Sequence, residues 1–182
     1  MIYKVTFLDY WHLSSGLSAG AKLDSSVTKD KDSLPYIPGK TIKGLLREQS
    51  LNELFLNNCF GREGSNIGQC YFSDVQIDDN TRKVIIENKS NIKNNSIIKK
   101  ELKHQLFDEI ASTKIDENGI AETGSLREIE VVIPITLYGK IDNIPHEYKQ
   151  EMINCLKKVK RMGLNRNRGL GRCQIEIIGE NK

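Results

Sequence analysis

The strongest constraint on the fold is the β-strand signal at residues 128–141, EIEVVIPITLYGKI, which is rich in β-branched residues. Such residues favour a pleated, half-buried surface. Pro134 interrupts this run and cannot donate a hydrogen bond to a neighbouring strand, so it indicates an edge or a bulge. Next comes a predicted amphipathic helix at 145–161, followed by a last strand at 173–178. Pro145 fits the first turn of that helix, and its apolar stripe consists of Tyr148, Met152, Leu156 and Val159.

The N-terminal part of the chain predicts the same alternation. Residues 2–11 and residues 70–77 both indicate strands. Between them, a helix should begin after Pro38, with Thr41 able to cap its start. Its apolar residues lie roughly on one face: Ile42, Leu45, Leu46, Leu54 and Phe55. The resulting β-α-β-β-α-β order is that of the α+β ferredoxin-like fold, on which RRM domains bind RNA.

A long excursion separates the two halves. Residues 78–100 are polar and rich in Asn and Lys, which predicts a flexible segment. Residues 108–127 look irregular or hairpin-like, with a turn at Glu117-Asn118-Gly119. The length of 182 residues suits one domain with a real core. We therefore expect a single RRM-like domain over 1–182, with a variable excursion at about 78–127.

Charge is distributed unevenly along the chain. The net charge is only +3, yet residues 152–175 hold seven basic residues and no acid. Such a block is typical of a local polyanion site. No apolar run approaches the ~20 residues that cross a bilayer, and the N-terminus lacks a signal-peptide layout. We therefore expect a cytoplasmic protein without a membrane partner.

The four cysteines, Cys59, Cys70, Cys155 and Cys173, form no CxxC pair. Zinc ligands usually arrive as close pairs, so we expect no bound zinc. Buried, reduced thiols are the expected state in the cytosol.

The first candidate site is the loop Met162–Arg172, which we call the glycine loop. Its glycines let the backbone approach a ligand, and arginine side chains make bidentate contacts with phosphate. It lacks the Lys-Ser/Thr ending of a P-loop, which disfavours a nucleoside triphosphate site. The alternative is a solvated basic turn. The residues expected to bind RNA here are Asn165, Arg166, Arg168 and Arg172.

Two further segments carry candidate residues. Lys40, Lys43 and Arg47 lie on one flank of a helix start, where cations attract phosphate. The alternative is a proline-stiffened helix entry with ordinary surface lysines. The loop from His12 to Asp32 also holds Asp24 and Asp30. A loop aspartate can bind Mg²⁺ or position a 2′-hydroxyl, although such residues are more often turn formers.

Together these segments resemble the RAMP superfamily of CRISPR-associated proteins, and within it the Csm- and Cmr-type backbone subunits of type III effectors. The most specific match is Leu34-Pro35-Tyr36-Ile37-Pro38-Gly39, followed by Lys43-Gly44 and Arg47. Three other segments match in the family's order: the loop from Leu13-Ser14-Ser15-Gly16 through Asp24 and Asp30, the stretch from Thr113 to Arg127 and Glu130, and the glycine loop.

The resemblance implies a modified ferredoxin-like fold whose hairpin, the thumb, wedges into a guide–target duplex. It implies subunits stacked head to tail on a guide RNA, with target RNA and other type III subunits, including copies or paralogues of this chain, as partners. Asp24 matches the aspartate that supports Mg²⁺-dependent cleavage of target RNA, and His12 and Arg127 join the RNA-binding set. Two alternatives stay open: a non-catalytic scaffold, and a metal-independent guide-processing endonuclease that uses His12.

Overall fold

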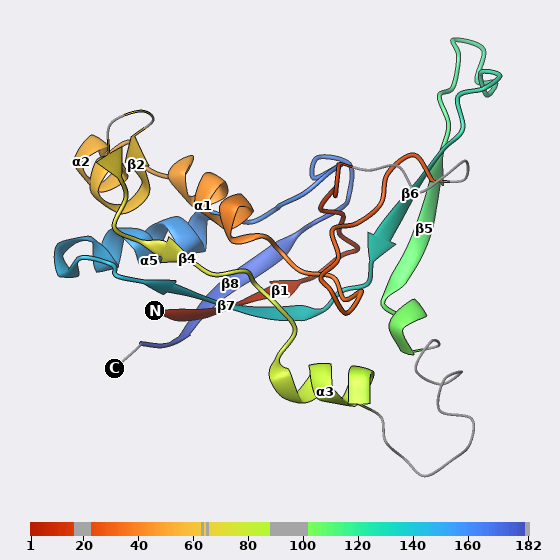
Figure 1. Ribbon diagram of the computed structural model, residues 1–182. Coiled ribbons are helices and arrows are strands. Elements are labelled where there is room, and N and C mark those ends of the chain that lie inside the picture. The colour runs from red at the N-terminus through yellow and green to blue at the C-terminus, as the bar shows by residue number, and fades with distance from the viewer. Residues whose placement is uncertain (17–22, 63, 65, 88–101, 181–182) are drawn as a thin grey trace.

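A four-stranded antiparallel sheet forms the centre of the computed structural model, which describes residues 1–16, 23–62, 64, 66–87 and 102–180. The strand order is β4-β7-β1-β8 (Figure 1). In chain order these strands are β1 (Ile2–Phe7), β4 (Tyr71–Phe72), β7 (Thr136–Asp142) and β8 (Cys173–Gly179). If these four strands are numbered 1 to 4 along the chain, their order across the sheet is 2-3-1-4. The predicted ferredoxin-like α+β fold is confirmed.

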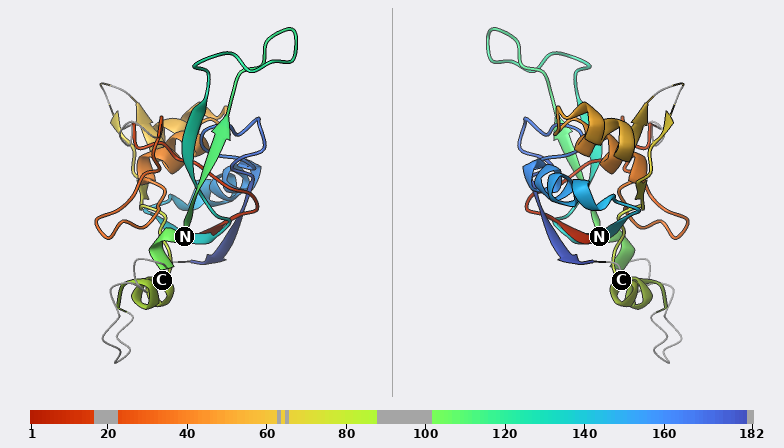
Figure 2. Two further views of the ribbon diagram at one scale, coloured as in Figure 1. Left: turned by 90° about the vertical axis from the view of Figure 1, so that its right-hand side faces the viewer. Right: turned by 90° about the vertical axis from the view of Figure 1, so that its left-hand side faces the viewer.

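Buried and partly exposed residues alternate along β1, and the buried ones show which face of the sheet is covered. In β1, Tyr3, Val5 and Phe7 are buried, and the residues between them are partly exposed. Helices α1 (Gly39–Arg47) and α5 (Lys149–Lys158) cover the buried face (Figures 1 and 2). Their apolar residues join the core: Ile42, Leu46, Met152 and Leu156.

The helix after Pro38 is shorter than the apolar pattern from Ile42 to Phe55 predicted. It ends at Arg47, and α2 (Glu53–Phe55) and a π-helical turn, η1 (Leu56–Phe60), follow. The side chain of Asn52 accepts a hydrogen bond from the Phe55 N–H and starts a new helix there. Thr41 does not cap α1. Instead, Asp74 accepts a hydrogen bond from the Gly39 N–H at 2.8 Å.

The predicted strand at 128–141 is two strands. β6 (Arg127–Val132) pairs with β5 (Phe107–Ser112) in a hairpin, and β7 belongs to the central sheet. The break falls at Pro134, which lies between the two strands and is neither an edge nor a bulge. Because proline has no N–H, the chain leaves one sheet and enters another there. The hairpin projects away from the body, at the end of the sheet opposite the two termini (Figure 1).

The polar excursion contains a helix that the sequence pattern did not predict, α3 (Asp79–Glu87). Asp78 accepts a hydrogen bond from the Thr81 N–H at 3.0 Å, which satisfies a free donor of the first turn. Residues 88–100 of the predicted flexible segment lie outside the described residues. The remaining small elements are the strands β2 (Gly61–Arg62) and β3 (Asn66–Ile67) and the 3₁₀ turn η2 (His146–Tyr148).

Candidate RNA interface

The glycine loop is held by backbone hydrogen bonds to the segment that follows β1. The Leu164 N–H donates to the His12 carbonyl, and the Gly171 N–H donates to the Tyr10 carbonyl, both at 2.8 Å. A Cβ on Gly163 would lie 2.3 Å from the His12 carbonyl oxygen. These glycines therefore allow close contact between two parts of the backbone, which is a structural role beside the predicted ligand approach.

Two predicted residues from distant parts of the sequence line one groove. Arg127 begins β6 at the base of the hairpin, and Arg168 comes from the glycine loop. The groove has a volume of about 630 Å³ and is lined mainly by polar residues, among them Lys114, Thr113 and Ser125. Two guanidinium groups and several hydroxyls in one groove suit a sugar–phosphate backbone. Sequence reasoning missed Lys114 because its position depends on how the hairpin folds.

The other predicted residues of the glycine loop differ in exposure and in the contacts they already make within the protein. Asn165 adopts a left-handed backbone conformation with φ of 54°, and its carbonyl accepts a hydrogen bond from the Arg168 N–H at 2.7 Å. Arg166 is exposed. Arg172 forms an ion pair with Asp9 at 3.2 Å, so part of its donor capacity is already used.

His12 is a fully buried residue of this region, with 0% exposure. Its Nδ1 contacts the Glu130 carbonyl, and its Nε2 lies 3.0 Å from the Ser25 hydroxyl. The ring thus joins the loop to β6 and has no open face for a ligand in this structure. Its predicted contact with RNA stays a prediction that requires the loop to move.

Asp24 is exposed at the base of the hairpin. Its N–H donates to the Glu128 carbonyl at 2.9 Å, and its Oδ2 accepts a hydrogen bond from the Glu128 N–H at 2.8 Å. Its Oδ1 accepts no hydrogen bond from the described residues. Glu130 fixes the same loop further along, because its carboxylate accepts from the Val27 N–H at 2.9 Å and from Lys29 Nζ at 2.6 Å. Within the described residues, the loop therefore presents Asp24 Oδ1 beside β6 without a hydrogen-bond donor.

The other loop aspartates have a structural role. Arg82 of α3 pairs with Asp30 at 2.6 Å and also with Asp32. Asp30 in addition accepts hydrogen bonds from the N–H groups of Asp32 and Leu34. These contacts tie α3 to the loop. The sequence contained no signal for Arg82, because it lies about 50 residues away in a segment that was predicted to be flexible.

The three predicted cations of α1 have different surroundings. Lys40 lines a second pocket of about 310 Å³ together with hydroxyl residues such as Ser14 and Thr28. The hydrogen bond from Cys59 lowers the pKa of the Cys70 thiol, burial opposes this effect, and the charge of Lys43 adds a smaller lowering effect. Arg47 is exposed at the last turn of α1.

The residues present fit Mg²⁺ only in part. No group of three or more metal-binding side chains occurs in the described part of the chain. Mg²⁺ often binds through one or two carboxylates and completes its shell with substrate phosphates and water, and Asp24 Oδ1 can supply one such ligand. All four cysteines are free and buried, as predicted.

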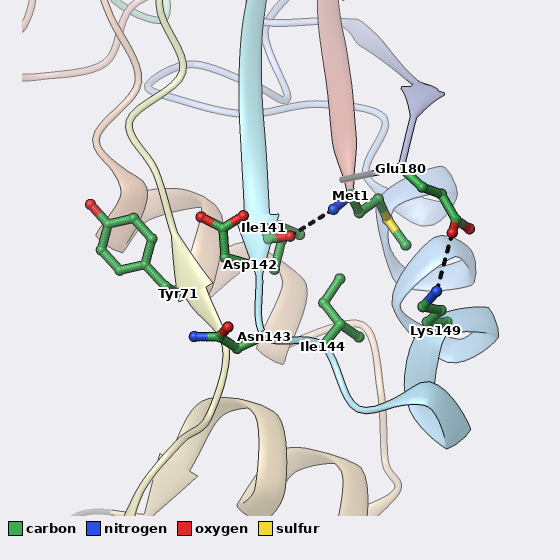
Figure 3. Close-up of a pocket in the computed structure, with 8 residues that line it drawn as sticks. All are labelled: Met1, Tyr71, Ile141, Asp142, Asn143, Ile144, Lys149 and Glu180. Atoms are coloured by element: carbon green, nitrogen blue, oxygen red, sulfur yellow. Dashed lines mark hydrogen bonds and ion pairs between the residues drawn. The ribbon is translucent and has the colours of Figure 1, made fainter. Parts of the chain in front are cut away.

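A separate pocket of about 530 Å³ lies at the far end of the sheet, beside Met1, Asp142 and Glu180 (Figure 3). None of the predicted site residues lines it. Lys149 and Glu180 form an ion pair across one side of it.

Comparison with known proteins supports the family resemblance. The RAMP superfamily model matches residues 4–174. A chain in a cryo-EM structure of the type III-B Cmr-beta bound to cognate target RNA is similar, with a TM-score of 0.70, 14% identity, and coverage of 96% of this chain and 95% of that chain. A chain of the apo state has a TM-score of 0.66 and 13% identity, with the same coverage of both chains. No curated protein matches. Within the described residues, no helix has the length and apolar composition needed to span a membrane.

Proposed function

The chain belongs to the RAMP superfamily, and on that premise we propose that it is a guide-RNA-binding backbone subunit of a type III CRISPR effector. We further propose that it cleaves guide-paired target RNA through Asp24. Its fold is shared with chains of the type III-B Cmr-beta structures. Guide RNA, target RNA and other effector subunits, including copies or paralogues of this chain, are the proposed partners.

The groove between the hairpin and the glycine loop carries the RNA-binding proposal. Arg127 and Arg168 are more than 40 residues apart in sequence and line the same groove. Phosphate contacts of this kind position a nucleic acid without reading its sequence, as a subunit that accepts any guide requires.

The hairpin supports the proposal that the guide–target duplex passes close to Asp24. Its tip exposes Ile115 and Ile120, whose side chains are 54% and 64% exposed. Asp116 keeps the tip rigid by accepting hydrogen bonds from the N–H groups of Asn118 and Ile120. A rigid apolar tip can enter the base stack of a duplex, and Asp24 lies where this hairpin leaves the body.

Asp24 would act on the RNA backbone. Its Oδ1, which accepts no hydrogen bond from the described residues, can accept the proton of a 2′-hydroxyl, whose oxygen attacks the adjacent phosphorus while the bond to the 5′-oxygen breaks. The 5′-oxygen takes up a proton and leaves as a hydroxyl. The backbone bonds with Glu128 hold Asp24 in place during this step. A bound Mg²⁺ would stabilise negative charge on the phosphate.

The geometry disfavours the alternative of a guide-processing enzyme based on His12. Both ring nitrogens of this buried residue are engaged. The scaffold alternative differs only in the role of Asp24, which an assay of target cleavage tests directly.

The RNA-binding proposal is tested with Arg127→Gln/Arg168→Gln and a single-stranded RNA of guide length. Each lost phosphate contact should lower the slope of log K against log salt by about 0.7, so the expected loss is about 1.4. The matched control is Lys4→Gln/Lys140→Gln, because both lysines are ion-paired on the open face of the sheet. If the arginine variant keeps the wild-type slope, the groove does not hold RNA.

A further inference from the structure

Two of the four buried cysteines, Cys59 and Cys70, lie at the two ends of one short hairpin. Cys59 belongs to η1, and Cys70 directly precedes β4. Between them, β2 pairs with β3, so the chain turns back on itself. The Cys70 N–H donates a hydrogen bond to the Cys59 carbonyl at 3.2 Å. The two cysteines are therefore direct neighbours in space.

Glycine lets the two sides of this hairpin approach so closely. A Cβ on Gly68 would lie 2.5 Å from the Cys59 carbonyl oxygen, and a Cβ on Gly61 would lie 2.5 Å from the Asn66 carbonyl oxygen. Standard backbone bond lengths and the 3.2 Å hydrogen bond place the Cα atoms of Cys59 and Cys70 at most about 7 Å apart. Disulfides usually join Cα atoms that are about 4.4–6.8 Å apart. The backbone therefore needs at most a small shift to bring this pair into disulfide range.

The thiol groups of the pair are also in contact. Cys59 donates a hydrogen bond to the Cys70 sulfur, and this bond raises the pKa of Cys59 and lowers the pKa of Cys70. Burial opposes the lowering at Cys70, and the positive charge of Lys43 adds to it. The thiolate is the form of cysteine that attacks an oxidant. Cys70 is therefore the expected nucleophile, with Cys59 beside it as the second thiol.

A pocket leads a small oxidant towards Cys70. The Cys70 Sγ lies 3.7 Å from the Asn143 carbonyl oxygen, and Tyr71 is the next residue in the chain. Asn143 and Tyr71 both line the pocket of about 530 Å³ at the far end of the sheet (Figure 3), for which the proposed function gives no role. Cys70 is 6% exposed, whereas Cys59 is fully buried. A small oxidant that enters the pocket therefore meets Cys70 before Cys59.

We propose that Cys59 and Cys70 form a reversible disulfide when the protein meets a peroxide. The Cys70 thiolate attacks one oxygen of hydrogen peroxide, the O–O bond breaks, and the departing hydroxide takes up the proton that Cys70 released. The Cys59 thiolate then attacks the sulfur of the Cys70 sulfenic acid, and the S–O bond breaks. The second hydroxide takes up the proton of Cys59 and leaves as water. Two thiols are thus oxidised to one disulfide, and one peroxide is reduced to two waters.

This inference does not depend on RNA binding or on cleavage. The test treats the purified full chain with hydrogen peroxide, blocks the remaining thiols under denaturing conditions and digests the protein with trypsin. Trypsin cleaves after Arg62, so Cys59 and Cys70 fall in separate peptides, residues 48–62 and 63–82. The proposal predicts that a disulfide joins these two peptides and that dithiothreitol separates them. A disulfide between any other pair, or none, would overturn the proposal.

Two matched variants each keep one pair of buried cysteines. Cys155→Ala/Cys173→Ala retains the proposed pair and should form the disulfide at the wild-type rate. Cys59→Ala/Cys70→Ala should lose its two thiols at least about tenfold more slowly, because no backbone hydrogen bond joins Cys155 to Cys173 among the described residues. Equal rates in the two variants would contradict the proposal. Circular dichroism checks folding, and the peptide map of the wild type decides the question if a variant does not fold.

Two further measurements test the order of the steps and the fit of the bond. Cys59→Ala should stop at the sulfenic acid of Cys70, which dimedone traps, and trapping on another cysteine would overturn the assignment of the nucleophile. Oxidised wild type should unfold at a temperature higher by about 5 °C, since the new bond restricts the unfolded chain. A lower unfolding temperature would contradict the claim that the pair is already placed for the bond.

Discussion

At the scale of single residues, Tyr3 has a buried hydroxyl without a hydrogen-bond partner among the described residues. A Cβ on Gly139 would lie 2.8 Å from that hydroxyl, so the ring occupies the space that this glycine leaves open. Burial also raises the pKa of the Tyr3 hydroxyl. The hydroxyl therefore loses its hydration without compensation.

We expect Tyr3→Phe to raise the free energy of unfolding by about 1 kcal/mol, because an unsatisfied buried polar group costs about 1–3 kcal/mol. The control is Tyr148→Phe, which removes an acceptor for Asn58 Nδ2 at 3.0 Å and should lower stability. Urea unfolding measures both. A clear loss of stability in Tyr3→Phe would show that the hydroxyl has a partner.

The buried thiol of Cys173 predicts a dependence of stability on pH. Burial raises its pKa from 9.0 to about 11, against a smaller opposing effect of Lys160. The folded protein keeps a proton that the unfolded chain releases, so this contribution is complete below pH 9 and is lost as pH rises towards 11. The stability difference between wild type and Cys173→Ala should therefore be smaller at pH 10.5 than at pH 7.5. A difference that does not change with pH would contradict this account.

At the scale of elements, the hairpin projects away from the body of the protein, and its tip is exposed. Among the described residues, the hydrogen bonds of the tip are local, such as that between the Thr113 and Ser125 hydroxyls at 2.7 Å. Replacing residues 115–121 by an Asn-Gly turn keeps Lys114 and Glu122 and should change the free energy of unfolding by less than ~0.5 kcal/mol, as is usual for exposed positions.

The same shortened hairpin should abolish cleavage of target RNA by the guide-loaded complex, because the duplex would no longer be opened beside Asp24. Guide binding should persist, since Arg127 and Arg168 are retained. Thermal unfolding and gel assays of cleavage measure the two effects. Cleavage at the wild-type rate would show that the tip has no role in opening the duplex.

Some elements could be predicted from local sequence patterns, and others could not. The strand predicted at 2–11 and the helix predicted at 145–161 exist over the shorter ranges Ile2–Phe7 and Lys149–Lys158, and they were predictable because their apolar residues repeat with the period of the element. Residues 128–141 look like one strand because periodicity does not show which sheet each half joins. α3 was missed because its stability depends on Asp78 and on the ion pairs of Arg82 with the distant loop.

At the scale of the whole molecule, the β-α-β-β-α-β order determines which loops meet. The segment after β1, the glycine loop and the base of the hairpin come together at one end of the sheet (Figure 1). Arg127, Arg168 and Asp24 were expected from the sequence to be site residues, and the structure places all three in this region. The sequence could not predict that Arg127 and Arg168 share a groove or that His12 is buried, because both depend on contacts between segments more than 40 residues apart.

The most direct test of the account is target-RNA cleavage by the assembled, guide-loaded complex with Mg²⁺, comparing wild type with Asp24→Asn. Asparagine keeps an acceptor for the Glu128 N–H and replaces the second, negatively charged oxygen by a neutral amide nitrogen that cannot accept a proton from a 2′-hydroxyl. The control is Asp79→Asn at an exposed position of α3. The account predicts that Asp24→Asn binds target RNA normally and cleaves it at least 100-fold more slowly, on the scale of ~10²–10⁴ expected for a catalytic base. Equal cleavage by Asp24→Asn, or none by wild type, would show that this subunit is a scaffold.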